Sequence, residues 1–447
     1  MQSGLSRDAN YVKHFSMKPK KHTASAIEFE AGNKVALLNN GDEFVPDLVE
    51  EIARATEEVL IETYEFAEDD VGKSVFDACK KAVANGAEVK LTIDAYGSSD
   101  FCSDDFIFDF VKAGIKIYLY EPKHRLPFNA QAYGRLHRKL AVIDNKIGYV
   151  GGVNLTEKYT LKFGEDGMRD FMLRIEGPAT DQVRKHCLEN IPDDEPYKDE
   201  ATLKPARDQG NTELALTCRD NHVGRRRAIE MCYLDAINEA KHSITLACAY
   251  FFPGLRLRHA LRKAADRGVK VRLIFQKKPD IPLVLTAARS HYAHFLHHGI
   301  EIYEYKTRPL HAKVAAIDDN WCTIGSSNLD PWSLTLNLEA NILVKDSTLT
   351  RELRGELETL IDESEAIDKA DYGRWVSLKS IGYRVSWWFF RLLLKFAVLI
   401  KVGNPLVRRL RRDGDAIDNT AKRLDGNKQT VEHERIDNRN SERANCT

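Results

Sequence analysis

Two short segments of the sequence contain the same chemically reactive residues in the same order. The first segment begins at His137 and the second at His311. A lysine, an aspartate, a glycine and an asparagine follow each histidine at equal offsets: Lys139, Asp144, Gly151 and Asn154 in the first segment, and Lys313, Asp318, Gly325 and Asn328 in the second. A single H-x-K-x4-D match would be weak evidence, because composition alone can produce one. Two matches at the same point of an internal repeat indicate a shared chemical role.

Histidine and lysine in this arrangement suit the transfer of a phosphoryl group. The residues after each histidine are largely apolar, so we expect the motifs to lie on strands, at 137–143 and from 311 onward. Side chains two apart on a strand point to the same face, so each imidazole would lie beside its lysine. A phosphate between two such faces meets two cations. One imidazole can attack phosphorus, and the other can protonate the leaving oxygen and then deprotonate the incoming alcohol or water.

Polar residues farther along each repeat can support this chemistry. The amides of Asn154 and Asn328, together with the lysines, can bind the non-bridging phosphate oxygens as negative charge develops. Asp144 and Asp318 come after the motif strands and can hold the lysines or align the imidazoles. The spacing leaves both roles open for these aspartates.

Two more carboxylates lie at comparable places downstream of the motifs, Asp170 in the first repeat and Glu339 in the second. Each can hydrogen-bond a catalytic imidazole across the interface between the repeats and set its tautomer. Both also fit ordinary polar residues at strand edges. The sequence has no H-E-x-x-H motif, carboxylate cluster or phosphate-binding loop, and the lysines supply positive charge, so we expect no metal and no other cofactor.

The residues around the motifs alternate between strand and helix patterns, and this alternation occurs twice. Short segments of similar sequence support the repeat: residues 113–118 are Ala-Gly-Ile-Lys-Ile-Tyr, and residues 298–303 are His-Gly-Ile-Glu-Ile-Tyr. We therefore predict a tandem duplication of one α/β domain. The expected strands are 35–38, 59–66, 88–93, 115–119, 243–250, 269–274 and 300–303, and the expected helices are 44–55, 71–84, 106–112, 228–240, 257–265 and 283–297.

Changes of composition divide the chain into six parts. The segment 191–212 includes an acidic, proline-bearing stretch without periodicity, which marks it as a linker. The other expected parts are a polar leader at 1–33, a first half at 34–190, a second half at 213–368, a basic and aromatic segment at 369–412 and a disordered polar tail at 413–447.

Composition and charge restrict the possible functions. The 447 residues are 43% hydrophobic and 30% charged, which is enough apolar material for more than one buried core. The formal net charge of -1 does not indicate a globally basic nucleic-acid binder, so we expect no nucleic-acid partner. The eight cysteines are scattered without a zinc-type spacing, and we interpret them as core thiols in a reducing compartment. We find neither a secretory signal nor a clean membrane span.

Aromatic, aliphatic and basic residues are concentrated between Trp387 and Arg412. One interpretation is a helix packed on the catalytic core. The other is an amphipathic helix at a membrane surface, with tryptophans at the headgroups and cations that reach anionic lipid. We favour the membrane surface as the partner, because apolar residues occur on nearly all sides of the segment.

The doubled H-x-K-x4-D pattern, followed in each copy by Gly-Gly or Gly-Ser and an asparagine, resembles the phospholipase D superfamily. Residues 249–253, 325–333 and 336–341 further resemble the bacterial cardiolipin synthases, and the short N-terminus is similar to that of their type B branch. The resemblance covers about residues 33–365. Residues 156–164, which follow the first motif, are less typical of the family.

The resemblance implies two pseudosymmetric α/β domains that share one active site and form a phosphohistidine. It also implies phosphatidyl transfer between phospholipids: a phosphatidylglycerol gives its phosphatidyl group to a histidine, glycerol leaves, and the hydroxyl of a second lipid takes the group. By analogy with the family's usual order, His137 is the nucleophile and His311 the general acid and then base, although the sequence is symmetric here. The location implied is the bacterial inner membrane, peripheral, on the cytoplasmic side.

Three other hypotheses share these residues. The same catalytic core could serve a nuclease or another phosphodiesterase, although the near-neutral charge and the segment from Trp387 argue against it. Simple hydrolysis of a lipid differs only in that water takes the place of the alcohol. A catalytically silent membrane scaffold would not need all six histidine, lysine and aspartate residues of the motifs. The acceptor and the oligomeric state are not identified by the sequence.

Overall fold

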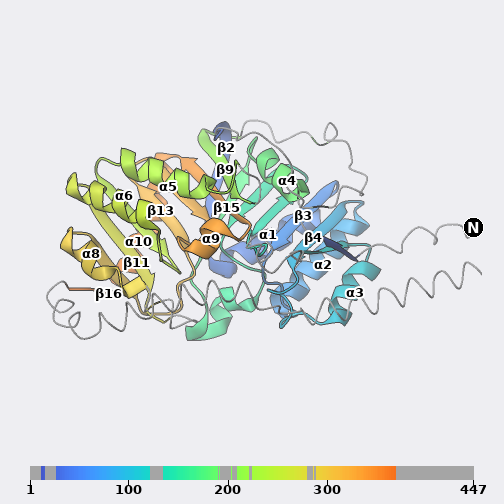
Figure 1. Cartoon of the computed structure of the whole chain (residues 1–447). Helices are drawn as coiled ribbons and strands as arrows, with labels where there is room; N and C mark the ends of the chain where they lie inside the picture. The colour runs from blue at the N-terminus through green and yellow to red at the C-terminus, as the bar shows by residue number, and fades with distance from the viewer. Residues whose placement is uncertain are drawn as a thin grey trace, which may run out of the picture.

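The structure of the protein is a computed structural model, and it describes residues 12–15, 27–120, 134–189, 191, 203, 209–220, 224–278, 285 and 288–368. Two α/β halves lie side by side, and their strands form one 16-stranded sheet over the described residues (Figure 1). The strand order is β1-β5-β4-β3-β6-β7-β8-β2-β9-β15-β14-β13-β10-β11-β12-β16. The order of the second half thus mirrors that of the first, which confirms the predicted duplication.

The first half places three parallel strands, β3, β4 and β5, beside the antiparallel motif strand β6. Its elements are β1 (Val12–Phe15), β2 (Glu30–Asn39), α1 (Asn40–Arg54), β3 (Glu58–Thr63), α2 (Asp70–Ala84), β4 (Glu88–Asp94), α3 (Asp104–Lys112), β5 (Lys116–Tyr120), β6 (Leu140–Ile143), β7 (Ile147–Gly151), the short 3-10 helices η2 (Glu157–Tyr159) and η3 (Leu161–Asp166), β8 (Phe171–Glu176) and α4 (Thr180–Glu189).

The second half repeats this arrangement with β10, β11 and β12 parallel and β13 antiparallel to β10. Its elements are β9 (Thr212–Arg219), α5 (Ala228–Glu239), β10 (Ser243–Cys248), α6 (Leu255–Asp266), β11 (Lys270–Gln276), α8 (Tyr292–His297), β12 (Glu301–Tyr305), β13 (Lys313–Ile317), β14 (Trp321–Gly325), α9 (Pro331–Thr335), β15 (Glu339–Lys345), α10 (Ser347–Asp362) and β16 (Ser364–Ala366).

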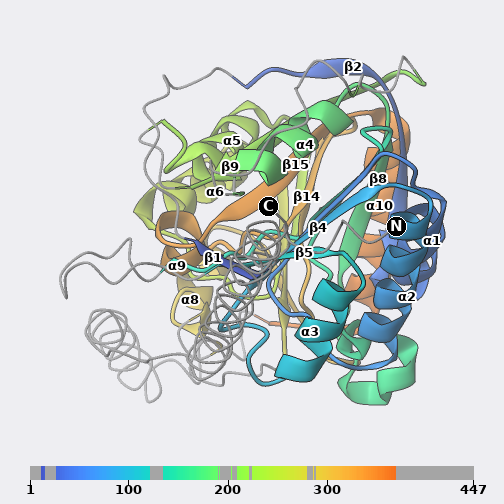
Figure 2. The ribbon, with the colours of Figure 1, turned by 90° about the vertical axis from the view of Figure 1, so that its right-hand side faces the viewer.

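The helices form where the apolar residues recur with helical spacing and capping residues mark the ends. In α2 the Asp69 side chain accepts the Gly72 N–H, and Gly86 follows the helix at φ +97°, a conformation that suits glycine. The buried face of α2 packs in the core of its half through Val71, Val75, Ala78, Cys79 and Ala82. Seen from the end of the molecule, α1, α2 and α3 lie on one side of the strands and α5 and α6 on the other (Figure 2).

A shared apolar core joins the halves. Leu173 and Val150 of the first half lie in one cluster with Ile324 and Ile342 of the second, and α4 and α10 add further apolar side chains to it. The strands β2 and β9 also pair, between Glu30 and Leu214 and between Asn33 and Thr212. The halves are therefore packed on each other rather than merely tethered by the linker.

The motif strands start later than the sequence predicts. β6 begins at Leu140 and β13 at Lys313, so both histidines precede their strands. The reason is that the residues just before them pair with the opposite half, in isolated bridges between Leu136 and Leu338 and between Arg169 and Leu310. The histidines therefore lie before the strands and not on them, but each lysine still lies beside its histidine, as predicted: Lys313 Nζ is 2.7 Å from His311 Nδ1.

Other boundaries also differ from the expected ones. The expected leader contains β1, which pairs in parallel with β5, and β2 already begins at Glu30. Of the expected helix at 283–297, the structure assigns the final turns, Tyr292–His297, to α8. The segments 369–412 and 413–447 lie outside the described residues, as does most of the linker. No helix of the described part is long and apolar enough to cross a bilayer.

Asp144 and Asp318 follow the C-terminal ends of the motif strands, whereas the histidines precede the N-terminal ends. Each aspartate holds a turn there. The Asp144 carboxylate accepts the backbone N–H groups of Thr56, Glu57 and Glu58, which lead into β3. The Asp318 carboxylate does the same for the three residues that lead into β10, namely Lys241, His242 and Ser243. At about 3.3 Å per residue, each aspartate lies a strand's length from its lysine. Their contacts thus indicate a structural role in place of the expected catalytic one.

We predict that Asp144→Ala lowers the free energy of unfolding by about 2–4 kcal/mol, because three backbone N–H groups lose a charged acceptor and alanine is strained at φ +51°. Equilibrium urea denaturation measures the change. Asp319→Ala is the matched control, since Asp319 is an exposed aspartate in an ion pair with Arg354, and it should cost less than about 1 kcal/mol. Equal stability of the Asp144 variant and the native protein would contradict the structural role.

Candidate active site

The two motif histidines meet between the halves. The ring centroids of His137 and His311 are 6.5 Å apart, a separation that one phosphoryl group can bridge. Their side chains are 13% and 12% exposed, so a substrate can reach them. The lysines beside them, Lys139 and Lys313, are fully buried. The structure therefore brings together the four residues whose repetition singled them out in the sequence.

Backbone contacts between the halves fix the position of each histidine. The His137 N–H donates to the Leu338 carbonyl at 2.9 Å, and the His311 N–H donates to the Arg169 carbonyl at 2.8 Å. Leu338 directly precedes Glu339 in the chain, and Arg169 directly precedes Asp170. Each histidine is thus aligned with a carboxylate of the opposite half.

Those carboxylates contact the imidazoles. Glu339 Oε2 lies 3.0 Å from His137 Nδ1, and Asp170 Oδ2 lies 2.5 Å from His311 Nδ1. The predicted contacts across the interface are confirmed for both residues. Because each Nδ1 is occupied, the Nε2 atom of each ring is the one left for chemistry.

Each lysine is held beside its histidine by a hydrogen bond to the backbone carbonyl of that histidine. Lys139 Nζ donates to the His137 carbonyl at 2.8 Å, and Lys313 Nζ donates to the His311 carbonyl. Burial lowers the pKa of Lys139 to about 7, and the nearby Lys313 acts in the same direction. A bound phosphate would raise the pKa of both lysines again, because its negative charge favours the charged ammonium form.

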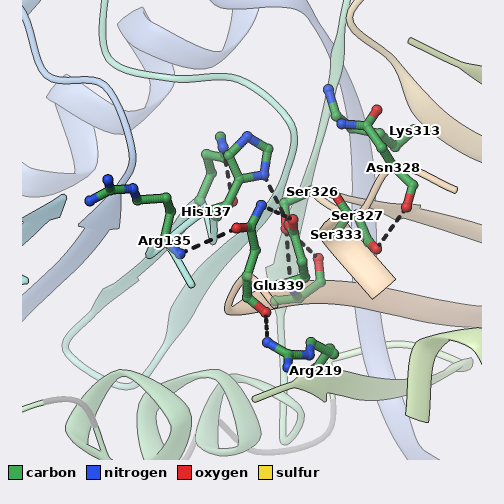
Figure 3. A network of polar contacts seen from close by, with 12 residues as sticks. Arg135, His137, Arg219, Lys313, Ser326, Ser327, Asn328, Ser333 and Glu339 are labelled. Atoms are coloured by element: carbon green, nitrogen blue, oxygen red, sulfur yellow. Dashed lines mark hydrogen bonds and ion pairs between the residues drawn. The ribbon is translucent and has the colours of Figure 1, made fainter. Parts of the chain in front are cut away.

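Several donors surround the Glu339 carboxylate. The Ser326 hydroxyl donates to Oε2 at 2.6 Å and the Asn337 amide to Oε1 at 3.3 Å, and Figure 3 shows His137 and Ser326 converging on this group. Burial alone would raise the pKa of Glu339, but His137, Lys139 and Ser326 outweigh it and lower the pKa. Glu339 is therefore ionised at neutral pH.

Asp170 has a different environment, and one position of the repeat contributes to the difference. Gly152 lies 15 residues after His137, where the second repeat has Ser326, 15 residues after His311. Gly152 offers no hydroxyl, and a Cβ atom there would come within 2.3 Å of the Asp170 carboxylate. Burial raises the pKa of Asp170 to about 7, although Lys313 and the Phe171 N–H lower it in part.

The hydrogen-bond partners assign different tautomers to the two imidazoles. Ionised Glu339 only accepts, so His137 carries its proton on Nδ1 and leaves a lone pair on Nε2. Lys313 Nζ lies 2.7 Å from His311 Nδ1, and an ammonium only donates. We infer from this contact that His311 Nδ1 is an acceptor and that the His311 proton lies on Nε2, with Asp170, whose pKa burial raises to about 7, as a second donor to Nδ1 below that pH. Burial lowers the pKa of both imidazoles, so both are neutral.

Asn154 and Asn328 form hydrogen bonds with the backbone of loops around the site. Asn154 Oδ1 accepts the Glu65 N–H at 3.2 Å, and Asn328 Oδ1 accepts the Tyr250 N–H at 3.2 Å. The Asn154 amide also donates to the hydroxyl of Tyr159 at 2.8 Å. Both asparagines are buried beside the motifs, and their expected contact with phosphate oxygens stays a prediction.

Three residues of the site were not found from the sequence. Tyr159 places its hydroxyl 3.4 Å from His311 Nδ1, and the Tyr64 ring lies 5.1 Å from that of His137. Ser326 was part of the noted Gly-Gly or Gly-Ser pattern, but its contact with Glu339 was not inferred. The unequal residues at this offset of the repeat were the signal that could have indicated it.

Metal ligands are not clustered in the described part of the chain: no group of three or more histidine, cysteine, aspartate or glutamate side chains there could hold an ion. The positive charge that can face a phosphate comes from the two lysines. Seven of the cysteines are unpaired and buried, in agreement with the expected core thiols.

Comparisons with known proteins agree with this geometry. The family described as "Cardiolipin synthase, PLD-like domain" matches residues 48–189 and 233–361. Cardiolipin synthase B of Salmonella typhimurium is 40% identical over 345 residues, which cover 76% of this chain and 83% of that protein. Cardiolipin synthase B of Escherichia coli K12 is 39% identical over 335 residues, or 74% of this chain and 81% of that protein.

A solved structure has the same fold. The crystal structure of phosphatidylserine synthase from Haemophilus influenzae superposes with a TM-score of 0.60 at 15% sequence identity, and covers 84% of this chain and 97% of that one. At this identity the likeness concerns the fold, and it extends over both halves.

We predict that kcat/KM for a phosphodiester falls as the pH rises through about 7. Asp170 and Lys139 both have a pKa of about 7. Loss of the Asp170 proton removes a donor to His311 Nδ1, which must receive a proton when His311 gives up the proton on Nε2, and loss of the Lys139 proton removes a cation. The pH profile of the native protein should therefore show a decline that involves two protons.

The Asp170→Asn variant separates the two groups, because its amide can donate to His311 Nδ1 but does not titrate. The pH profile of kcat/KM for this variant should show a decline that involves one proton only. A native profile that stays flat to about pH 9 would contradict the proton positions assigned above.

Proposed function

Because the chain belongs to the family of cardiolipin synthases with phospholipase D-like domains, we propose that it transfers a phosphatidyl group from one phosphatidylglycerol to another and releases glycerol. The observation that best supports this is the different set of partners at the two Nδ1 atoms, from which we infer opposite tautomers, His137 with a lone pair on Nε2 and His311 with a proton on Nε2. A displacement at phosphorus needs one group of each kind. Phospholipids are accordingly the substrates.

The first step forms a covalent intermediate. His137 Nε2 attacks the phosphorus of the donor lipid, and the bond from phosphorus to the glycerol headgroup oxygen breaks. His311 gives its Nε2 proton to that oxygen and takes the Asp170 proton on its Nδ1, 2.5 Å away, so glycerol leaves as a neutral alcohol, His311 stays neutral and Asp170 becomes a carboxylate. Positive charge that develops on His137 is stabilised by Glu339 at its Nδ1, 3.0 Å away. The phosphatidyl group is now bound to His137.

The second step reverses the proton movement. His311 Nε2, now without its proton, takes the proton of the terminal hydroxyl of a second phosphatidylglycerol, and the proton on His311 Nδ1 returns to Asp170. The oxygen of that hydroxyl attacks phosphorus, and the bond to His137 breaks. Cardiolipin forms, and both imidazoles return to their starting tautomers. In both steps Lys139 and Lys313 balance the negative charge on the non-bridging oxygens, with Asn154 and Asn328 as additional donors.

We place the protein at the cytoplasmic side of the bacterial inner membrane, as a peripheral protein. The substrates carry two acyl chains each and reside in a bilayer, so the site must meet a lipid surface. The segment between Trp387 and Arg412 has the aromatic and basic composition of an interfacial helix. It lies outside the described residues, so this part of the proposal comes from the sequence.

The test of the function is to incubate the purified protein with phosphatidylglycerol vesicles and to identify the products by mass spectrometry. We expect cardiolipin and glycerol in equal amounts. Phosphatidic acid alone would make the protein a hydrolase with the same catalytic residues, since water would then take the second alcohol's place. The absence of any lipid product would overturn the proposal and direct attention to nucleic acids and soluble diesters.

A second prediction tests the separate roles of the histidines. With an activated substrate such as phosphatidyl-p-nitrophenol, the leaving group needs no proton. His311→Ala should therefore release about one equivalent of nitrophenol and retain a phosphatidyl adduct on His137, because the base for the second step is missing. Intact-protein mass spectrometry and peptide mapping detect the adduct.

Steady-state turnover of phosphatidylglycerol should fall by at least about 10²–10⁴-fold in both alanine variants. His137→Ala should form no adduct with either substrate, and circular dichroism serves as the control for folding. An adduct on His311 in the His137→Ala variant would reverse the assignment of nucleophile and acid.

A further inference from the structure

The repeat of the first half contains an extra segment beside the active site. From Asn154 to Asp170 the chain advances 16 residues, whereas from Asn328 to Glu339 it advances 11. The second half uses this stretch for the short helix α9 and a turn into β15. The first half uses it for η2 and η3, and η3 (Leu161–Asp166) accounts for the added length. This segment projects from the lower edge of the molecule in Figure 1.

The extra segment exposes apolar side chains on a fixed backbone. Leu161 is 64% exposed and Phe163 is 45% exposed. The Leu161 N–H donates to both carboxylate oxygens of Asp42 at 3.0 Å, and the Met168 N–H donates to the Lys158 carbonyl at 2.6 Å. A leucine and a phenylalanine held in water by such contacts are unfavourable unless something covers them.

A third exposed apolar side chain belongs to the loop after β4, where the Phe101 ring lies 3.8 Å under Lys158 Nζ of the extra segment. Tyr96 follows β4 directly and is 45% exposed, and the Arg135 guanidinium lies 4.3 Å over its ring. Arg135 is two residues from His137, just as Leu161 is two residues from Tyr159, which contacts His311. We call Tyr96, Leu161 and Phe163 the apolar rim. The rim is thus linked to His137 through Arg135 and to His311 through Tyr159.

We propose that the apolar rim inserts into the surface of the bilayer and thereby turns the active site toward the lipid. This inference rests on the proposed function, because a substrate with two acyl chains leaves the bilayer most readily where the site edge touches it. An aromatic ring under a cation, as in Tyr96 and Arg135, suits the headgroup region, and Leu161 and Phe163 suit the acyl boundary.

The charges on the extra segment predict how the contact responds to salt. Lys162 pairs with Asp70 at 3.5 Å and Lys158 with Glu65 at 3.7 Å. Glu157, Glu165 and Asp166 belong to the same segment, so it has no excess of positive charge. Contact through the rim is therefore apolar in origin and resists high salt, in contrast to a contact made by the basic segment that ends at Arg412.

A fluorophore attached at position 163 tests the insertion locally, whatever other part of the chain binds lipid. Seven native cysteines are buried, and Cys446→Ser removes the remaining one, so Phe163→Cys can be labelled with an environment-sensitive dye such as nitrobenzoxadiazole. The matched control is Met231→Cys. Met231 is also exposed, at 40%, but lies on α5, away from the motifs. Both labelled full-length proteins are mixed with phosphatidylglycerol vesicles at low and high salt.

We expect a blue-shifted and stronger emission at position 163 at both salt concentrations, and no change at position 231. Unchanged emission at 163, or equal changes at both positions, would overturn the proposal. In addition, Leu161→Ser combined with Phe163→Ser should weaken vesicle binding at high salt by about tenfold. Turnover of a monomeric short-chain phosphatidylglycerol should stay within about twofold, because these side chains do not contact the histidines.

The same short-chain assay separates this proposal from the proposed function. If the native protein forms no transfer product from the short-chain lipid while position 163 still enters the bilayer, the proposed function is contradicted and the insertion of the apolar rim is supported. If the transfer product forms and the dye at position 163 stays in water, the insertion of the apolar rim is contradicted and the proposed function is supported.

Discussion

Each catalytic imidazole in this protein is completed by the opposite half of the chain. Glu339 holds His137 and Asp170 holds His311, and the residue before each carboxylate accepts the backbone N–H of the same histidine. A histidine and its carboxylate are thus joined twice, through the side chain and through the backbone. The site can form only when the two halves are docked, and the shared apolar core with α4 and α10 stabilises that docking. The buried lysines add a reason for tight packing, because charges this far from water need fixed partners.

The two halves are alike in fold but differ in protonation. Ser326 gives Glu339 a hydroxyl donor that helps keep it ionised, whereas Gly152 gives Asp170 none and burial raises the pKa of that carboxyl. In the proposed mechanism one imidazole is then the nucleophile and the other the proton donor. The glycine and the serine at this offset, together with burial and the different neighbours of the two carboxylates, therefore contribute to the asymmetry that a two-step displacement needs.

Much of the fold could be predicted from the sequence, because the alternation of apolar runs and turn residues occurs twice. β4 and α2, for example, lie within one residue of their expected bounds. The contacts of Glu339 and Asp170 could also be predicted, since both residues follow the motifs at comparable places. The positions of the histidines relative to the strands could not, because Leu136 and Leu310 pair with the opposite half and such pairing leaves no periodic signal. The true contacts of Asp144 and Asp318 were hidden for a similar reason, as they depend on backbone N–H groups about 80 residues away in sequence.

The close approach of Gly152 to Asp170 has a consequence for how such a protein can evolve. A serine at position 152 would restore the symmetry of the repeat, but its Cβ atom would collide with the carboxylate that it should serve. The reverse change, Ser326 to glycine, would leave Glu339 without its hydroxyl donor and thus impair the nucleophile. No single substitution at these two positions leads back to two equal halves without loss. Under the proposed mechanism, the two histidines therefore cannot exchange roles through one substitution at this offset.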